Sequence, residues 1–318
     1  MSRTTKTLSL GGIAALALPL ALACGGGNDQ LPPAPPPPPP VVVAPPAPTP
    51  PPAPPAPPPP PPVTLLPGAA APDPATPPIV TIVSPTKGQR IAAEKVGSFP
   101  IKVKEKGWTP VTGGQHIHVV LDNRPYWPIF DETKPLTLGD ILKGDTLAEG
   151  QHLLVVFPSR PSHESVKTKG ALDYTEFYVG KGKDHPVDLK KPILVASRPK
   201  GEYAGDKANH VLVDFQLINE SDKTFGDGKD HVHVTVNGPG VTGNLEADVT
   251  HFGTPLYLDA LQSGSYTVKF DLLDGKNAPV PGPLNSFTRS ITIVRDVPAA
   301  DGAPAVAAPP PAPAGKPL

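Results

Sequence analysis

Apolar and polar residues alternate in short runs between about residue 79 and residue 296. In the stretch 116–123 the apolar residues Ile117, Val119 and Leu121 occupy every second position, which is the period of a strand with one buried face. The same His-x-His-Val order returns in 231–238. Other runs of five to eight residues are rich in β-branched and aromatic residues and end at Gly, Pro, Asn or Asp, and no helical period is sustained. The pattern therefore predicts an all-β fold.

Landmarks of this pattern recur at a nearly constant spacing. Gly201 follows Gly88 by 113 residues, His231 follows His116 by 115, and Gly264 follows Gly150 by 114. A fixed period of this length indicates a duplicated unit. We expect two similar domains, at 79–181 and 190–296, each large enough to bury a modest core.

The stretch Leu261–Val268 resembles the tyrosine corner of immunoglobulin-like sandwiches, in which a tyrosine opens strand F and its hydroxyl bonds to the chain upstream. Tyr266 stands at that position, whereas the first domain has His152 there. The resemblance implies two tandem Ig-like β-sandwiches. The single cysteine cannot form a disulfide within the chain, so the sandwiches must be held by apolar packing.

The first 27 residues have the order of a bacterial export signal. Arg3 and Lys6 precede a charge-free apolar run, and small residues lead directly to Cys24. This order resembles the lipobox of bacterial lipoproteins, which implies a signal peptide at 1–23 and a lipid on Cys24; Gly25, in place of aspartate, favours the outer membrane. The alternative is a plain secretory signal followed by an incidental cysteine.

Most of the 51 prolines lie on either side of the predicted domains. Proline fixes φ and has no N–H to donate, so we expect neither helix nor sheet in 24–78, but a disordered, extended stalk. It would serve as a spacer or, alternatively, as a docking site for proline-reading domains. The segment 297–318 is rich in Pro and Ala and should be a disordered tail.

The formal net charge of −1, with no basic block, argues against nucleic acid as a partner. Contact with the membrane would come from the lipid on Cys24.

The clearest candidates for a functional site are the two His-x-His pairs, His116 with His118 and His231 with His233. Residues i and i+2 of a strand point to one side, so two imidazoles could hold one zinc or copper ion. The spacing does not fix a third ligand. The candidates are Glu176, His152 and His163 in the first domain, and Asp227, Asp230 and His210 in the second. The alternative is that the histidines lie on the solvated face, bind no cofactor and recur through duplication.

The loop after the predicted strand 153–157 carries Arg160, His163 and Glu164. It would lie at one end of the sandwich, where Ig-like folds recognise partners, and with Trp127 it is a candidate binding surface. Its neighbouring residues cannot form a nucleophile–base relay, so we expect no catalytic residues and no enzyme. Trp127, with Trp108 and Tyr126, could alternatively form an aromatic platform for a sugar ring.

The sequence thus favours a lipid-anchored protein of the outer membrane that presents two Ig-like domains for binding or scaffolding an envelope protein or cell-wall glycan. The alternatives are a periplasmic metal-binding protein that uses the four histidines of the two pairs, and an accessory module that acts on carbohydrate.

Overall fold

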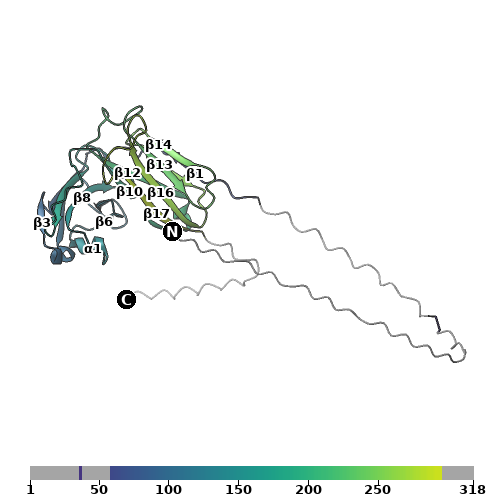
Figure 1. Ribbon diagram of the computed structural model, residues 1–318, viewed down its shortest axis with the longest axis horizontal. Helices are drawn as coiled ribbons and strands as arrows, with labels where there is room; N and C mark the ends of the chain where they lie inside the picture. The colour runs from purple at the N-terminus through teal and green to yellow at the C-terminus, as the bar shows by residue number, and fades with distance from the viewer. Residues whose placement is uncertain (1–35, 38–57, 296–318) are drawn as a thin grey trace, which may run out of the picture. The chain divides into compact units, whose positions relative to one another are not determined.

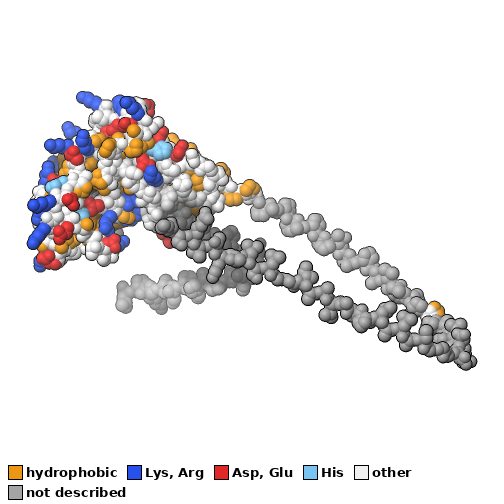
Figure 2. Space-filling view, in the orientation of Figure 1, with side chains coloured by type: hydrophobic (Ala, Val, Ile, Leu, Met, Phe, Trp, Pro, Cys, Tyr) orange, Lys and Arg blue, Asp and Glu red, His pale blue; other side chains and the backbone are white. Residues whose placement is uncertain are grey.

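The computed structural model describes residues 36–37 and 58–295, which are almost entirely strands and turns (Figure 1). The predicted signal peptide, Cys24 and the predicted tail lie outside the described residues. Within the described part, no helix is long and apolar enough to cross a membrane. Acidic and basic side chains are interspersed on the face seen in Figure 2, in line with the small net charge.

The first sandwich consists of a three-stranded sheet of order β2-β4-β7 and a five-stranded sheet of order β3-β9-β8-β5-β6. Its elements are β2 (Ile79–Ser84), β3 (Gln89–Ile91), η1 (Ala93–Ser98), β4 (Pro100–Lys106), β5 (His116–Leu121), β6 (Trp127–Ile129), β7 (Leu136–Thr137), α1 (Leu138–Leu142), β8 (Gly150–Ser159) and β9 (Asp173–Val179). The pairs within the sheets are antiparallel except for the parallel pair β3–β9.

The second sandwich repeats this topology, with sheets of order β1-β15-β12-β10 and β11-β17-β16-β13-β14. Its elements are β1 (Thr64–Pro67), β10 (Ile193–Arg198), β11 (Gly201–Ala204), η2 (Gly205–Ala208), β12 (His210–Ile218), β13 (His231–Asn237), β14 (Leu245–Val249), β15 (Leu256–Asp259), β16 (Gly264–Leu273) and β17 (Ser286–Val294). Here too one pair, β11–β17, is parallel. The predicted pair of similar Ig-like sandwiches is confirmed.

Alternate aliphatic residues of the two repeated strands form the cores, as the pattern predicts. Ile117, Val119 and Leu121 are fully buried in the first sandwich, and Val232 and Val234 in the second. Burying such side chains is the main stabilising contribution in a fold without disulfides.

The tyrosine corner is present in the second sandwich. The Tyr266 hydroxyl donates to the carbonyl of Pro239 at 2.6 Å and accepts the backbone N–H of Gln262 at 2.8 Å. In the first sandwich His152 replaces it: its Nε2 lies 2.9 Å from the carbonyl oxygen of Ala148 and its Nδ1 lies 2.6 Å from a carboxylate oxygen of Asp122. The histidine thus makes the same kind of bond to the chain upstream.

The expectation that no sheet forms in 24–78 is wrong near the end of that segment. β1 adds an edge strand to the second sandwich, with Leu65 paired to Leu258 of β15. Residues 63–66 contain no proline, and Pro67 stands at the end of an edge strand, where its missing N–H costs little. Val63 and Leu65 are buried in the core of the second sandwich, so a segment that precedes the first sandwich in the sequence belongs to the second.

The two sandwiches share a buried interface, which the alternation of the strands did not predict. Phe157 and Val155 of the first sandwich pack in one apolar cluster with Val195 and Ile218 of the second. Strand β5 is consequently buried along its whole length. The alternative that His116 and His118 lie on a solvated face is therefore wrong, because the second domain covers the outer face of that sheet.

Candidate metal centre

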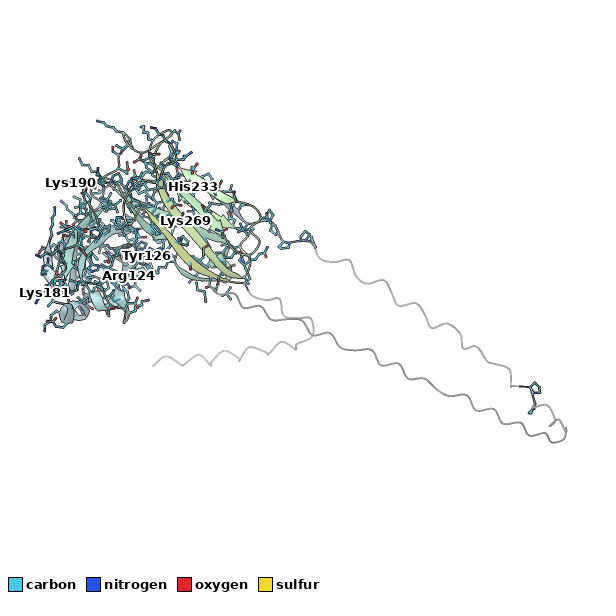
Figure 3. The ribbon with its side chains drawn as sticks, viewed as in Figure 1. Arg124, Tyr126, Lys181, Lys190, His233 and Lys269 are labelled. Atoms are coloured by element: carbon cyan, nitrogen blue, oxygen red, sulfur yellow. The ribbon has the colours of Figure 1, made fainter. Side chains whose placement is uncertain are left out.

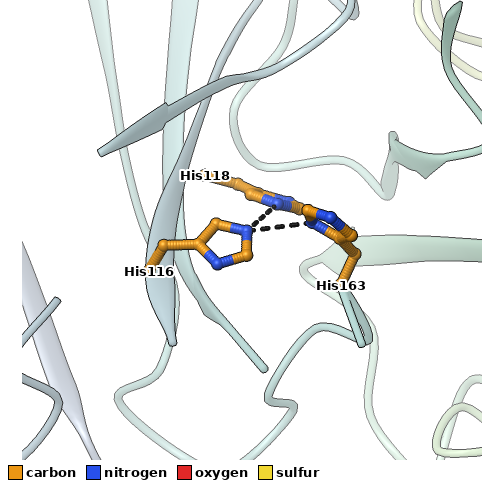
Figure 4. A group of neighbouring side chains, drawn as sticks. All are labelled: His116, His118 and His163. Carbon is orange, nitrogen blue, oxygen red and sulfur yellow. Dashed lines mark hydrogen bonds between the residues drawn. The ribbon is translucent and has the colours of Figure 1, made fainter. Parts of the chain in front are cut away.

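Three imidazoles meet at the buried interface. His116 and His118 project from the same side of β5, and His163 approaches them from the loop after β8 (Figure 4). One ring nitrogen of each residue lies within 4.8 Å of those of the other two. In the part of the chain that the structure describes, this is the one group of three or more His, Cys or acidic residues close enough to hold a metal ion.

The strand register explains why His163 reaches the pair. β5 and β8 are antiparallel neighbours, and His116 lies opposite Ser159, the last residue of β8. The loop that follows turns back at once, with the N–H of Arg160 bonded to the carbonyl of Glu164 at 2.9 Å and the N–H of His163 bonded to the carbonyl of Arg160 at 2.8 Å. His163 has a φ of 68°, a left-handed conformation that directs its side chain to the start of β5.

Hydrogen bonds outside the cluster fix which nitrogens point into it. Nδ1 of His116 lies 2.8 Å from the carbonyl oxygen of Gly114, which can only accept, so this nitrogen carries the proton and Nε2 presents its lone pair. Nε2 of His116 is 2.9 Å from Nε2 of His118 and 3.1 Å from Nδ1 of His163. Without a metal ion, a proton on His118 Nε2 can satisfy that short contact; a metal ion would satisfy all three lone pairs.

Groups around the cluster orient the other two rings. The Ser197 hydroxyl is 3.3 Å from Nδ1 of His118, the nitrogen that does not face the cluster. The Tyr126 hydroxyl is 3.3 Å from Nδ1 of His163, the nitrogen that faces His116, so its hydrogen bond to that lone pair would be replaced when a metal ion binds. The Tyr126 ring stacks on His118 with centroids 3.5 Å apart, and the Phe130 ring lies 4.5 Å from that of His116. A partner on the outer nitrogen, such as Ser197, holds an imidazole ligand in one tautomer and one orientation.

The electrostatic setting keeps all three imidazoles neutral. Burial lowers the pKa of His116, and it lowers that of His118 well below its usual value, with repulsion from neighbouring histidines and cations adding to the effect. Burial and the Arg198 guanidinium lower the pKa of His163 to about 3. Burial raises the pKa of Tyr126 well above its usual value, so its hydroxyl keeps its proton. Neutral imidazole is the form that binds a metal ion.

The second His-x-His pair does not form such a site. Nδ1 of His233 lies 2.6 Å from a carboxylate oxygen of Asp248, and Nδ1 of His231 lies 3.1 Å from the carbonyl oxygen of Lys229. The other carboxylate near His233 belongs to Glu246, which is largely exposed, at 3.7 Å. No third histidine joins this pair among the described residues, so only one repeat has the three-imidazole arrangement.

Several other predicted residues have structural partners instead. Glu176 accepts from Gln151 at 2.6 Å, and His210 contacts Asp259 at 2.7 Å. Asp227 and Asp230 are not brought together with a histidine pair.

Arg160 and Glu164 do not form a free recognition surface. Glu164 accepts the N–H of Ala71 at 3.0 Å, and Arg160 donates to the carbonyls of Ala71 and Pro72 at 3.2 and 2.9 Å. The segment after β1 covers them, whereas the sequence predicted that this segment belongs to a disordered stalk.

The aromatic platform is also not formed. Trp108 is buried and donates to the carbonyl of His116 at 3.2 Å, and Tyr126 is 3% exposed. Trp127 alone remains partly exposed, at β6.

No protein-family model matches the chain, and no curated protein matches it. Among solved structures, it is similar to the fibronectin(III)-like modules of Clostridium thermocellum CbhA, with 16% identity over 68% of this chain and 95% of that chain and a TM-score of 0.24. It is also similar to the FN1–FN3 domains of chicken CNTN1, with 11% identity over 70% of this chain and 67% of that chain and a TM-score of 0.23.

A third similarity, to the β-glucuronidase of Parabacteroides merdae, has 10% identity and a TM-score of 0.21, and it covers 69% of this chain but only 24% of the enzyme. All these TM-scores are low, so the assignment of Ig-like sandwiches rests on the strand order and hydrogen bonds described above.

Proposed function

We propose that this chain is a metal-binding protein that holds a copper or zinc ion through His116, His118 and His163. The observation that supports it is the convergence of three neutral imidazoles, two buried and His163 half-buried, with one ring nitrogen of each directed at the same point. A buried cluster of this kind is costly for a purely structural role, since apolar residues of similar size would fill the space without polar atoms to satisfy.

The distances suit such an ion after a small adjustment. Metal–nitrogen bonds of about 2.0–2.1 Å place tetrahedral ligands about 3.4 Å apart. Two of the separations, 2.9 Å from His116 to His118 and 3.1 Å from His116 to His163, are a few tenths of an ångström shorter, and the third, from His118 to His163, is within 4.8 Å. His163 sits on a loop, so rotation of its side chain would adjust both of its separations toward the tetrahedral value.

The donor set favours copper over most competing metals. Imidazole nitrogen suits zinc, copper and nickel, and copper leads the affinity order of the divalent series. The cluster includes neither a carboxylate nor a thiolate, and Arg198 and Lys200 are close enough to repel positive charge. A singly charged cuprous ion is repelled least by these two cations.

Titration of the metal-free protein with Cu(I), Cu(II) or Zn(II) should therefore raise its thermal stability. Ligand at about 100 times its Kd adds about 2.7 kcal/mol to the free energy of unfolding. For a folded part of this size we expect a rise in Tm of roughly 5–10 °C. X-ray absorption of the bound metal should show three imidazole nitrogens at about 2.0 Å.

The His163→Asn variant should lose most of this stabilisation. Asparagine tolerates the left-handed backbone at this position, so the metal-free fold should be preserved. The matched control is His233→Gln, at the second histidine of the other pair, which should bind metal like the wild type. Equal metal affinity of wild type and His163→Asn would show that the ion is bound elsewhere.

We also propose that the protein is anchored in the outer membrane through Cys24, since a charged start, an apolar run and small residues precede this cysteine. In a Gram-negative host the wild type should incorporate labelled palmitate and partition into detergent, whereas Cys24→Ser should remain unlabelled and appear in the soluble fraction. An unlabelled wild type would leave the plain secretory signal as the correct interpretation.

A further inference from the structure

A second candidate site lies beside the metal centre, in a cleft of about 600 Å³ between α1, β6 and the start of β11. This volume falls in the range of small-molecule sites. One wall consists of aromatic and aliphatic side chains, namely Tyr126, Trp127, Phe130, Ile141 and Leu142. The other groups that line it are mainly cationic: Arg124, Lys143 and Lys200, with Asp145 as the acidic member.

Positive charge at this cleft is only partly compensated. Arg124 pairs with Asp145 at 2.9 Å, and Asp145 is the only acidic side chain in the lining. Lys200 forms no ion pair with any described residue; it donates to the carbonyl of Tyr126 at 2.7 Å, and its ammonium lies 3.9 Å from the centre of the Tyr126 ring. Lys143 lies over Trp127 at 5.8 Å and likewise has no acidic partner in the described part.

Two arginines behind the lining add to this charge. Arg198 and Arg289 form no ion pair within the described residues, and the Nε of each is buried without a hydrogen-bond partner. Arg289 is 8% exposed and donates to the carbonyl of Arg124 at 3.1 Å. Burial and repulsion from Arg198, Lys143 and Arg289 lower the pKa of Lys200 to about 8, so these cations are close enough to affect one another.

The unpaired cations of this cleft favour a bound anion. Lys200, Arg198 and Arg289 are partly or fully buried without a carboxylate partner, which is costly because the low-dielectric surroundings strengthen their mutual repulsion. An anion in the cleft would offset this cost, and an aromatic or planar group attached to it would fit the apolar wall.

We propose that this cleft binds a small organic anion, a carboxylate or phosphate ester that carries a planar apolar group. The anionic group contacts Lys200 and Lys143, and the apolar group lies against Trp127 and Phe130. The rings of Tyr126 and Phe130 separate the cleft from the three histidines, since each also contacts one of them. The anion site does not depend on a bound metal.

Fluorescence titration of the full metal-free protein, in the presence of a chelator, tests the proposal. Phenyl phosphate and benzoate should change the emission of Trp127 in a saturable way, and Trp127→Phe should remove that signal while Trp108 remains. Benzyl alcohol, which has the ring without the charge, should bind at least about tenfold more weakly. Inorganic phosphate should also bind more weakly, because it lacks the apolar group.

Charge variants locate the site. Lys200→Gln should weaken binding of phenyl phosphate by about tenfold, and Lys143→Asn by a smaller factor, since that side chain is exposed. Lys181→Gln, an exposed lysine away from the cleft and labelled with Arg124 and Tyr126 in Figure 3, should have no effect.

Three results would overturn the anion site: equal binding of benzyl alcohol, an unchanged Kd in Lys200→Gln, or binding that requires added copper and is lost in His163→Asn. The last result would make the anion a ligand of the metal ion. The reverse case, anion binding without any metal binding, would refute the metal centre and would support the anion site in the cleft.

Discussion

Replacing Asp214 by alanine should lower the free energy of unfolding by about 3–5 kcal/mol, among the largest effects expected of a single substitution. Asp214 is 2% exposed and lies on β12 of the second sandwich. It accepts the side chain of Lys167 and both the N–H and the hydroxyl of Ser165, the latter two at 3.0 and 2.6 Å. All these donors belong to the loop of the first sandwich that also carries His163.

The size of the effect follows from what the substitution leaves behind. The side chain of Lys167 is only 9% exposed, so its ammonium would remain away from water without a carboxylate. Removing one partner of a buried pair costs far more than the pair contributes, because the remaining charge is unpaired. Urea unfolding of the metal-free protein, followed by circular dichroism, measures the change.

A surface pair in the same protein provides the control. Arg124 and Asp145 are 2.9 Å apart, but the Asp145 side chain is 71% exposed. Asp145→Ala should therefore change stability by less than about 1 kcal/mol. The double variant Asp214→Leu with Lys167→Met should recover much of the loss, since it removes both charges. A loss below about 1 kcal/mol in Asp214→Ala would mean that water reaches Lys167.

The fold was predictable because each sandwich follows a local rule. Alternation identifies the buried residues of β5 and β13, and the tyrosine corner at Tyr266 indicates the sandwich class. The segment 136–142 shows neither period clearly, and it contains both β7 and α1. The helix begins where Thr137 and Asp140 form a capping box, a signal that was present in the sequence.

The contact between the domains was harder to predict. Residues 153–157 form an unbroken apolar run, which is typical of a strand buried on both faces, whereas the equivalent strand β16 alternates. That difference indicates that only the first sandwich has its outer face covered. It does not identify what covers it, and so the burial of His118 could not be derived from the pattern of β5 alone.

The third ligand could be predicted only as one of several candidates. His163 lies in a loop, and its position depends on the length of β8 and on its own left-handed φ. The antiparallel pairing of β5 with β8 accounts for its position, since the end of β8 lies beside the start of β5. His152 and Glu176 lie elsewhere on this sheet, where their own partners hold them.

Acidification of the metal-free protein should destabilise it steeply below pH 6.5. The three clustered imidazoles have lowered pKa values in the folded state, chiefly through burial, whereas in the unfolded chain each titrates near 6.5. Between the folded and unfolded pKa values the unfolded chain binds more protons, so stability falls as pH decreases. Each histidine that stays neutral in the folded state lowers the free energy of unfolding by about 1.4 kcal/mol per pH unit of acidification. The three together lower it by up to about 4 kcal/mol per pH unit.

The contribution of His163 can be bounded more closely. With its folded pKa at about 3, it alone should account for about 2 kcal/mol between pH 6.5 and pH 5. His152 affects stability at higher pH. Burial would lower its pKa, but the hydrogen bond and charge of Asp122 outweigh burial, so its pKa in the folded state is raised. Its contribution to the free energy of unfolding is therefore fully present below pH 6.5 and is lost as the pH rises through its pKa in the folded state.

Urea unfolding at pH 7, 6.5, 6, 5.5 and 5 with a chelator present measures the slope. His163→Asn, which removes one of the three clustered imidazoles, should reduce it by about one third. A stability that stays flat between pH 6.5 and pH 5.5 would mean that the imidazoles are protonated in the fold. Three adjacent imidazolium ions beside Arg198 and Lys200 would repel one another and any added cation, so that result would contradict the metal centre as well.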